Sequence, residues 1–174
     1  ARTSYFKGDF TWAESQLKVL KSSTSQLIAN DALDLMLLIT DNKFEDSTQT
    51  ALKSYAKADL LSFQNKTDDA IIILEAVITE HKGTAIEDQA LYKQGKLFEA
   101  KKEYEKAEKN YLNIITNYKE DLLGDDAYFS LAVIYEKYLQ RPEKAKEFYE
   151  QILFNYEDSI YFVESRKKYR MLRG

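Results

Sequence analysis

The stretch that decides the fold is residues 104–118, YEKAEKNYLNIITNY. Its apolar residues recur at steps of three and four, which is the spacing of one face of an α-helix and differs from the alternation of a strand. The same face occurs 37 residues earlier in residues 67–81, TDDAIIILEAVITEH, and 38 residues later in residues 142–156, PEKAKEFYEQILFNY. Three copies in register predict an internal repeat.

A second helical pattern precedes each copy, so the repeating unit is predicted to be a helical hairpin. Leu91, Gly95 and Phe98 come before the second copy, and Leu131 and Tyr135 come before the third. Small residues stand where the two helices would approach closely, because larger side chains would clash there. These small residues are Ala58, Gly95 and Ala132 on the first helices and Ala70, Ala107 and Ala145 on the second helices.

The composition favours helices throughout the chain. The 174 residues include only five glycines and one proline, so residues that break helices are scarce. The periodicity predicts helices over residues 9–22, 25–41, 47–65, 68–82, 86–101, 104–119, 124–139, 142–156 and 159–172. The predicted fold class is therefore all-α.

The hairpins resemble those of the tetratricopeptide repeat family. Tyr128-x-x-Leu131-Ala132-x-x-Tyr135 is similar to the first helix of the family's unit, and Gly8-Asp9-Phe10-x-x-Ala13 is similar to the start of the second. The resemblance implies a right-handed superhelical α-solenoid of antiparallel helix hairpins with a C-terminal capping helix. It also implies a segment of a large bacterial multi-repeat protein, with the cell envelope or periplasm as the expected location and the cytoplasm as the alternative.

The resemblance also divides the chain, which is expected to form one array. The expected parts are a partial repeat at 1–24, a degenerate segment at 25–47, hairpins at 48–83, 86–119 and 123–157, and a capping helix at 158–174. Residues 1–8 are expected to be the remainder of a truncated first helix. The interval from Ala13 to Ala70 exceeds one unit by twenty residues, which is enough for one extra helix. We therefore expect an irregular array there, with Asp41–Lys43 as a connection or kink.

The residue inventory argues against catalysis and against metal binding. The chain has no cysteine, and its single histidine, His81, aligns with Tyr118 and Tyr156 at a predicted helix C-terminus. The acid pairs Asp68–Asp69 and Asp125–Asp126 begin predicted helices, where carboxylates cap backbone N–H groups. We predict no catalytic residue, no metal site and no cofactor, and hence no enzyme. The apolar runs are too short for a membrane-spanning helix.

An aromatic series on the first helices is the candidate binding site. Tyr55, Tyr92 and Phe129 are spaced by 37 residues and lie off the core face. In the resembled family this position lines the concave groove, and the residues one and two turns further on are Asp59, Lys96, Val133, Glu99 and Glu136. We therefore predict a scaffold that binds a protein or peptide partner in this groove. The alternative is that the rings only fill space between adjacent repeats.

The two ends of the chain allow further interpretations. The last helix carries Arg166, Lys167, Lys168, Arg170 and Arg173 against Glu164. This basic patch suits the C-terminus of a capping helix, or a contact with an acidic partner, lipid head groups or nucleic acid. The formal net charge of −4 makes nucleic-acid binding by the rest of the chain unexpected. At the other end, the apolar face of residues 10–20 predicts self-association or a role as a spacer in a longer array.

Overall fold

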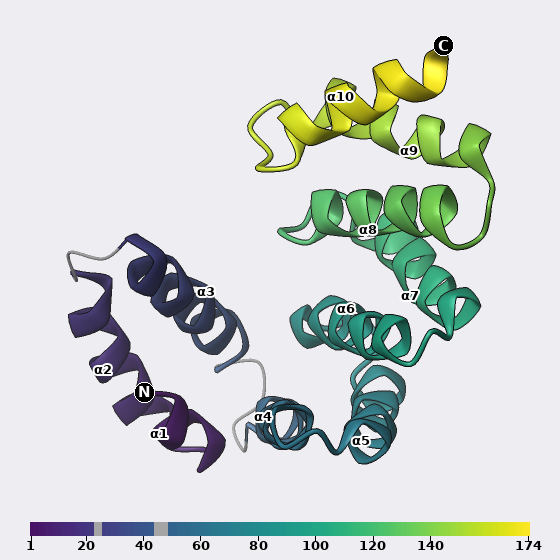
Figure 1. The fold of residues 1–174 in the computed structure, drawn as a ribbon. Helices are drawn as coiled ribbons and strands as arrows, with labels where there is room; N and C mark the ends of the chain where they lie inside the picture. Colours follow the sequence, from purple (N-terminus) through teal and green to yellow (C-terminus); the bar gives the residue numbers. More distant parts are fainter. Residues whose placement is uncertain (23–25, 44–48) are drawn as a thin grey trace. The chain divides into compact units, whose positions relative to one another are not determined.

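The computed structural model describes residues 1–22, 26–43 and 49–174, and the regular structure in these residues is helical (Figure 1). The helices are α1 (Arg2–Phe6), α2 (Phe10–Lys21), α3 (Gln26–Asn42), α4 (Thr50–Phe63), α5 (Thr67–Glu80), α6 (Ala85–Ala100), α7 (Tyr104–Asn117), α8 (Gly124–Lys137), α9 (Pro142–Asn155) and α10 (Phe162–Arg173). The predicted all-α class is confirmed. The nine predicted helices are present, and α1 forms the short first helix expected in residues 1–8.

The chain divides into two compact units, residues 1–90 and residues 91–174. In the first unit α1 packs against α2, and α4 packs against α5. In the second unit α7, α8, α9 and α10 pack in order, each against the next (Figure 1). This pairwise packing of consecutive helices is that of a helical solenoid built from hairpins.

Each hairpin turn contains one residue in the left-handed region. These residues are Gly8 (φ 75°), Asn65 (φ 60°), Lys102 (φ 61°) and Gln140 (φ 52°). Each stands five residues before a fully buried alanine of the following helix, namely Ala13, Ala70, Ala107 and Ala145. Because a left-handed residue allows the last carbonyls of a helix to be satisfied, the shared position makes the four turns variants of one motif. The turn between α1 and α2 therefore belongs to the same series as the other three.

The length of the turn explains why the repeat spacing changes from 37 to 38 residues. Between α6 and α7, the N–H of Glu103 donates to the carbonyl of Phe98, five residues back, at 2.9 Å. Between α8 and α9, the N–H of Arg141 donates to the carbonyl of Tyr135, six residues back, at 2.9 Å. The last hairpin therefore holds one more residue in its turn. The packing surfaces of its two helices keep their register.

Small residues permit the close approach of paired helices. Gly95 on α6 faces Tyr111 on α7, and a Cβ atom on Gly95 would lie 2.6 Å from Cε1 of that ring. The ring of Tyr111 is fully buried, and so are the alanines that begin the second helices. The prediction that small residues mark the helix contacts is confirmed at these positions.

The helix α3 stands outside the series of hairpins. Within residues 1–90, α1 packs against α2 and also against α4, whereas α3 packs mainly along α2. The helix α4 thus packs beside α1, as the first helix of the next hairpin would. The helix α3 accounts for the twenty residues by which the interval from Ala13 to Ala70 exceeds one repeat. The predicted connection at Asp41–Lys43 is wrong in position, because Asp41 and Asn42 continue α3. Residues 44–48, where the connection would continue, lie outside the described residues.

Carboxylates begin several helices, as expected. Asp9 caps α2 by accepting a hydrogen bond from the N–H of Trp12 at 3.2 Å. The pairs Asp68–Asp69 and Asp125–Asp126 stand in the first turns of α5 and α8, where their charge interacts favourably with the positive end of the helix dipole. The N-cap positions of these two helices are occupied by Lys66 and Leu123 and have no side-chain capping hydrogen bond, so the prediction that the acid pairs cap these helices from the N-cap position is wrong. Within the described residues, no helix has the length and apolar character needed to span a membrane.

Candidate binding site

The three aromatic residues of the predicted groove lie on first helices, but at different depths. Tyr55 on α4 belongs to residues 1–90, and only 7% of it is exposed. Tyr92 on α6 and Phe129 on α8 belong to residues 91–174 and are half-buried. Tyr55 therefore contributes mainly to the interior of its unit, whereas Tyr92 and Phe129 each retain some accessible surface.

Phe129 is partly covered by an aromatic residue that the sequence reasoning missed. Its ring stacks on Tyr161, with centroids 4.3 Å apart and planes 12° apart. The Tyr161 hydroxyl donates to Oδ1 of Asp126 at 2.6 Å, which fixes the ring over α8. Burial and this hydrogen bond raise the pKa of Tyr161 above its ordinary value. The sequence placed Tyr161 inside the predicted helix 159–172, whereas α10 begins at Phe162, so the repeat spacing did not mark Tyr161 as a neighbour of Phe129.

Lys96 is the most accessible polar residue of the predicted set in residues 91–174. Its side chain is 42% exposed, and its ammonium group donates to Oγ of Ser130 on α8 at 3.0 Å. The same group lies 3.2 Å from a carboxylate oxygen of Glu99 and 5.4 Å from the centre of the Tyr92 ring. Lys96 therefore links α6 to α8 and places a cation beside an aromatic ring at the surface.

The two predicted glutamates are engaged within their own hairpins. Glu99 accepts a hydrogen bond from the hydroxyl of Tyr111, and Glu136 accepts one from the hydroxyl of Tyr149, each at 2.6 Å. Glu136 also pairs with Lys168 on α10 at 2.7 Å. Burial alone would raise the pKa of Glu136, but the hydrogen bonds from Lys168 and Tyr149 hold it below its ordinary value. These carboxylates therefore stabilise the fold, whether or not they also contact a partner.

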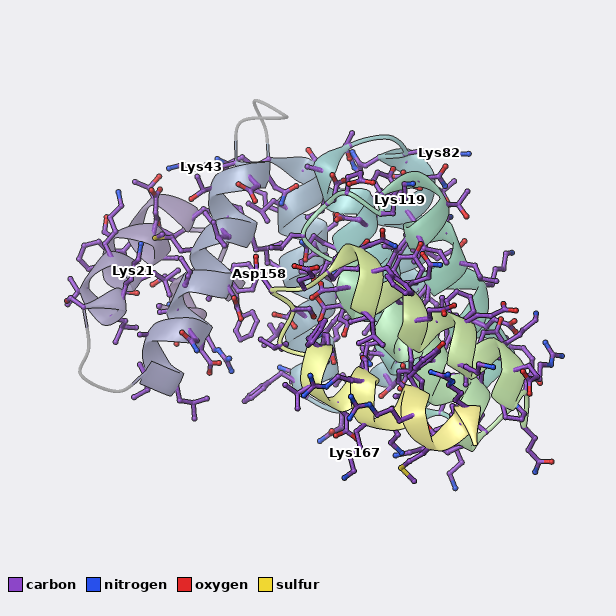
Figure 2. All side chains as sticks on the ribbon, turned by 90° about the horizontal axis from the view of Figure 1, so that it is seen from above. Lys21, Lys43, Lys82, Lys119, Asp158 and Lys167 are labelled. Carbon is purple, nitrogen blue, oxygen red and sulfur yellow. The ribbon has the colours of Figure 1, made fainter. Side chains whose placement is uncertain are left out.

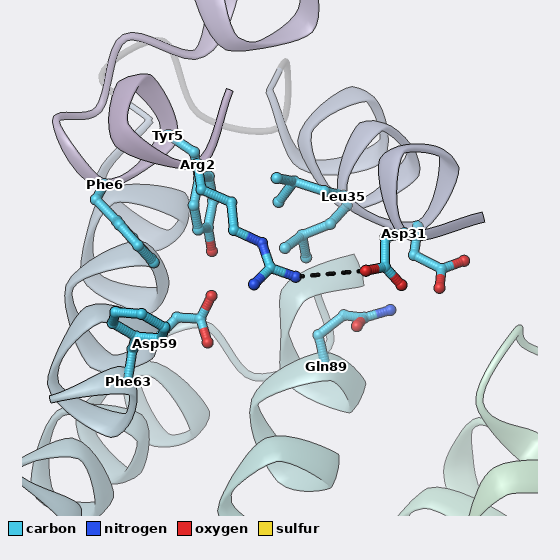
Figure 3. Close-up of a pocket in the computed structure, with 10 residues that line it drawn as sticks. Arg2, Tyr5, Phe6, Asp31, Leu35, Asp59, Phe63 and Gln89 are labelled. Atoms are coloured by element: carbon cyan, nitrogen blue, oxygen red, sulfur yellow. Dashed lines mark ion pairs between the residues drawn. The ribbon is translucent and has the colours of Figure 1, made fainter. Parts of the chain in front are cut away.

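The remaining predicted groove residues are Val133 and Asp59. Val133 is half-buried on α8, one turn beyond Phe129. Asp59 lies on α4 in the other unit, where it lines a pocket of about 270 Å³ together with residues of α1 and α3 (Figure 3). The structure thus brings Tyr92, Lys96, Phe129 and Val133 onto the neighbouring helices α6 and α8, and it brings Asp59 to a separate pocket.

The basic patch on α10 is only partly neutralised. Lys168 is half-buried in its pair with Glu136. Arg166, Lys167, Arg170 and Arg173 are exposed, and in the described part of the chain none of these four has an ion pair. The side chain of Lys167 projects away from the ribbon (Figure 2). The helix therefore presents a cationic face that the fold itself leaves available.

His81 lies at the C-terminus of α5, where it was predicted. It is the C-cap residue of that helix, and Gly83 follows it with a φ of 81°. Among the residues that the structure describes, no group of three or more histidine or acidic side chains is placed to hold a metal ion.

Residues 89–121 and 126–159 match the family model of the tetratricopeptide repeat. These two segments are tetratricopeptide repeats. The two matched segments contain most of α6 with α7, and α8 with α9, which are the helices of the second and third sequence copies. The hairpins α1–α2 and α4–α5 lie outside the matched segments, but they share the left-handed turn and the buried alanine of the tetratricopeptide hairpins. Comparison with curated proteins gives no significant match.

Proposed function

We propose that this chain is a noncatalytic scaffold that binds a protein or peptide partner through the first helices of its tetratricopeptide repeats. Tetratricopeptide repeats generally mediate protein–protein interaction. One observation carries the proposal for this chain: Tyr92, Lys96, Phe129 and Val133 share the neighbouring helices α6 and α8, linked by the hydrogen bond from Lys96 to Ser130. We call these four residues the α6–α8 surface.

The chemistry of the α6–α8 surface suits a peptide partner. Tyr92 and Phe129 are held against Tyr111 and Tyr161, so they offer rigid apolar area that loses little entropy on binding. Lys96 supplies a cation for a carboxylate or carbonyl of the partner, and Glu99 and Glu136 border it with negative charge. In residues 1–90, Tyr55 and Asp59 stand at the equivalent positions, but Tyr55 is buried and Asp59 lines a pocket, so the proposed surface rests on α6 and α8.

Site-directed photo-crosslinking tests this proposal. A photoreactive residue at position 96 or 133 should capture a defined partner, whereas one at Lys109 on α7 should not. Lys109 is the matched control, because it is an exposed lysine on the second helix of the same hairpin. Equal capture of the same proteins from positions 96 and 109 would refute binding at the α6–α8 surface.

The affinity of the captured partner then gives the energetic test. Lys96→Ala and Val133→Asp are each expected to weaken binding by about 2 kcal/mol, which is typical of an interface anchor and corresponds to roughly a thirtyfold change in Kd. Lys109→Ala should leave Kd unchanged. All three variants should retain the helical circular dichroism of the parent chain.

The cationic face of α10 supports a second candidate function, contact with an acidic protein or with nucleic acid. Its support is that Arg166, Lys167, Arg170 and Arg173 are exposed and, among the described residues, lack ion pairs. Binding through these side chains should weaken steeply as salt rises, because counterions are released on association. Affinity that stays constant between low and physiological salt would reject this candidate and leave the α6–α8 surface untouched.

A further inference from the structure

A pocket in residues 1–90 is lined by three aspartates and a buried tyrosine hydroxyl. It lies among α1, α3, α4 and the start of α6, and its volume of about 270 Å³ is just below the range of about 300–1,000 Å³ that small-molecule pockets occupy (Figure 3). Its size suits a single side chain of a partner. The walls include Leu35 from α3 and the rings of Phe6 and Phe63, whose centroids are 6.3 Å apart.

The charges in the pocket favour a cation. Asp31 and Asp34 reach it from neighbouring turns of α3, and Asp59 reaches it from α4, whereas Arg2 is the only basic residue among the described residues that line it. Among the described residues these acids do not form a group that could hold a metal ion. An organic cation, with its charge spread over several donors, fits this dispersed arrangement of carboxylates better.

The hydroxyl group of Tyr5 is an independent indication that the pocket binds a ligand. Its side chain is fully buried, and its hydroxyl group has no hydrogen-bond partner in the described residues. Figure 3 shows the hydroxyl oxygen directed into the pocket, on the side where Arg2 and Asp59 lie. Burial, followed by the charges of Tyr55 and Asp59, raises the pKa of the Tyr5 phenol, so this group stays protonated at neutral pH. A buried hydroxyl without a partner is rare and asks for a donor or acceptor from elsewhere.

Arg2 shows that the pocket admits a guanidinium group without filling the site. Its side chain crosses the pocket towards Asp31, with 3.9 Å between Nη2 and Oδ2 (Figure 3). Both side chains of this pair are about two-thirds exposed, at 66% and 62%. Such an exposed, long ion pair contributes little to stability. Arg2 is therefore readily displaced by a better-placed cation.

We propose that this pocket binds the side chain of an arginine in a peptide partner, which displaces Arg2. The planar guanidinium can donate to the aspartates on two walls at once and to the Tyr5 oxygen, while Phe6 and Phe63 contact its apolar stem. The pocket depends on α3, the helix outside the hairpin series, because α3 supplies two of the three acids. The proposal rests on the proposed function only in taking the partner to be a peptide.

The test is a titration of the ¹⁵N-labelled chain, followed by NMR, with Nα-acetyl-arginine amide. Its matched control is Nα-acetyl-citrulline amide, which has nearly the same shape but no charge. We expect the arginine probe to shift the amide resonances of residues around Tyr5, Asp34 and Asp59, and the citrulline probe to bind at least tenfold more weakly. Equal shifts from both probes would overturn the proposal.

Charge variants separate the pocket from general attraction. Arg2→Gln should tighten binding of the arginine probe at least threefold by removing the internal competitor, whereas Lys7→Gln, which removes a cation nearby in the sequence, should have a smaller effect. Asp34→Asn should weaken binding at least threefold, and the control Asp158→Asn should not. Unchanged or weaker binding by Arg2→Gln would refute the displacement.

The Tyr5 hydroxyl gives a readout that does not depend on a loss of folding. Tyr5→Phe removes an unpartnered buried hydroxyl, so the free protein should melt at the same or a higher temperature, while its affinity for the arginine probe falls severalfold. Unchanged affinity would remove the hydroxyl from the site. The arginine probe does not involve the α6–α8 surface, so the two proposals can fail independently. If the probe does not bind but crosslinking at positions 96 and 133 captures a partner, the pocket alone is rejected. If the probe binds but crosslinking captures no partner, the α6–α8 surface alone is rejected.

Discussion

Replacing Gly95 by alanine tests whether the close contact between α6 and α7 controls the stability of that hairpin. The new Cβ would lie 2.6 Å from Cε1 and 2.8 Å from Cζ of Tyr111. The Tyr111 ring cannot easily move away, because it is fully buried, packs against Tyr92 and donates a hydrogen bond to Glu99 at 2.6 Å. The substitution therefore forces a displacement in a packed interior.

Two opposing effects set the expected magnitude. Glycine to alanine in a helix interior stabilises by about 1 kcal/mol through helix propensity. Overpacking of a filled core costs about 1–3 kcal/mol. At the equivalent positions the earlier hairpin has Ala58 with Leu74, and the last hairpin has Ala132 with Tyr149, both fully buried. The conflict is therefore specific to the packing of Tyr111 against α6, and a smaller side chain at position 111 should remove it. We expect Gly95→Ala to lower the free energy of unfolding by about 1 kcal/mol in the parent chain, and to raise it by about 1 kcal/mol when Tyr111→Leu is also present.

Urea denaturation followed by circular dichroism at 25 °C measures this double-mutant cycle. The two substitutions should show a coupling free energy of about 2 kcal/mol, well above the error of such cycles. Tyr111→Leu alone should be destabilising, because the ring and its hydrogen bond to Glu99 are lost. If Gly95→Ala stabilises the parent chain as much as the Tyr111→Leu variant, the two residues are uncoupled and the steric argument fails.

Three further predictions concern the turns, the tyrosines and the N-terminal end. Lys102→Gly should raise the free energy of unfolding by about 0.5–1 kcal/mol, because Lys102 has a φ of 61°, which glycine adopts without strain. The control Lys109→Gly, inside α7, should lower the free energy of unfolding by about 1 kcal/mol. Urea denaturation measures both changes. Burial raises the pKa of Tyr5 and Tyr55 in the folded chain, so the stability that their neutral forms provide is intact below pH 10 and declines above it, by up to about 1.4 kcal/mol per pH unit and tyrosine. Tyrosinate absorbance should then appear together with the loss of helicity, and its appearance in a fully helical chain would contradict the prediction. Trp12 is 57% exposed on α2, so sedimentation should show self-association of the chain that Trp12→Glu abolishes; a parent chain that stays monomeric would refute it.

The fold could be predicted from the sequence because its decisive signals are local and repeated. The apolar periodicity located the helices, and the resemblance of residues 8–13 to the start of a second helix predicted the short helix α1 before them. The spacing also showed that the last repeat is one residue longer. It could not show that the extra residue lies in the turn before Ala145, because turn length depends on which carbonyl each N–H reaches.

The candidate site was less predictable because its surroundings come from segments without a repeat. Tyr161 stacks on Phe129 only because the connection between α9 and α10 passes over α8. Asp59 was assigned to a groove by its register, but its neighbours are residues of α1 and α3, and the sequence gives no rule for how an extra helix packs. A register position therefore predicts which face of a helix a residue occupies, and not what covers that face.

The glutamates of the predicted groove allow two interpretations, because the same positions can serve partner binding or the stability of the hairpin. Tyr111 occurs with Glu99 and Tyr149 with Glu136, whereas the equivalent pair in the earlier hairpin is Leu74 with Ser62. Hydrogen bonding explains this difference, because each tyrosine hydroxyl donates to its glutamate, and leucine has no such requirement. Loss of either carboxylate would leave a buried hydroxyl unpaired, at a cost of about 1–3 kcal/mol. Weakened partner binding in a Glu99 or Glu136 variant would therefore reflect a disturbed hairpin as much as a lost contact, so Lys96 and Val133 are the positions at which a binding role can be judged.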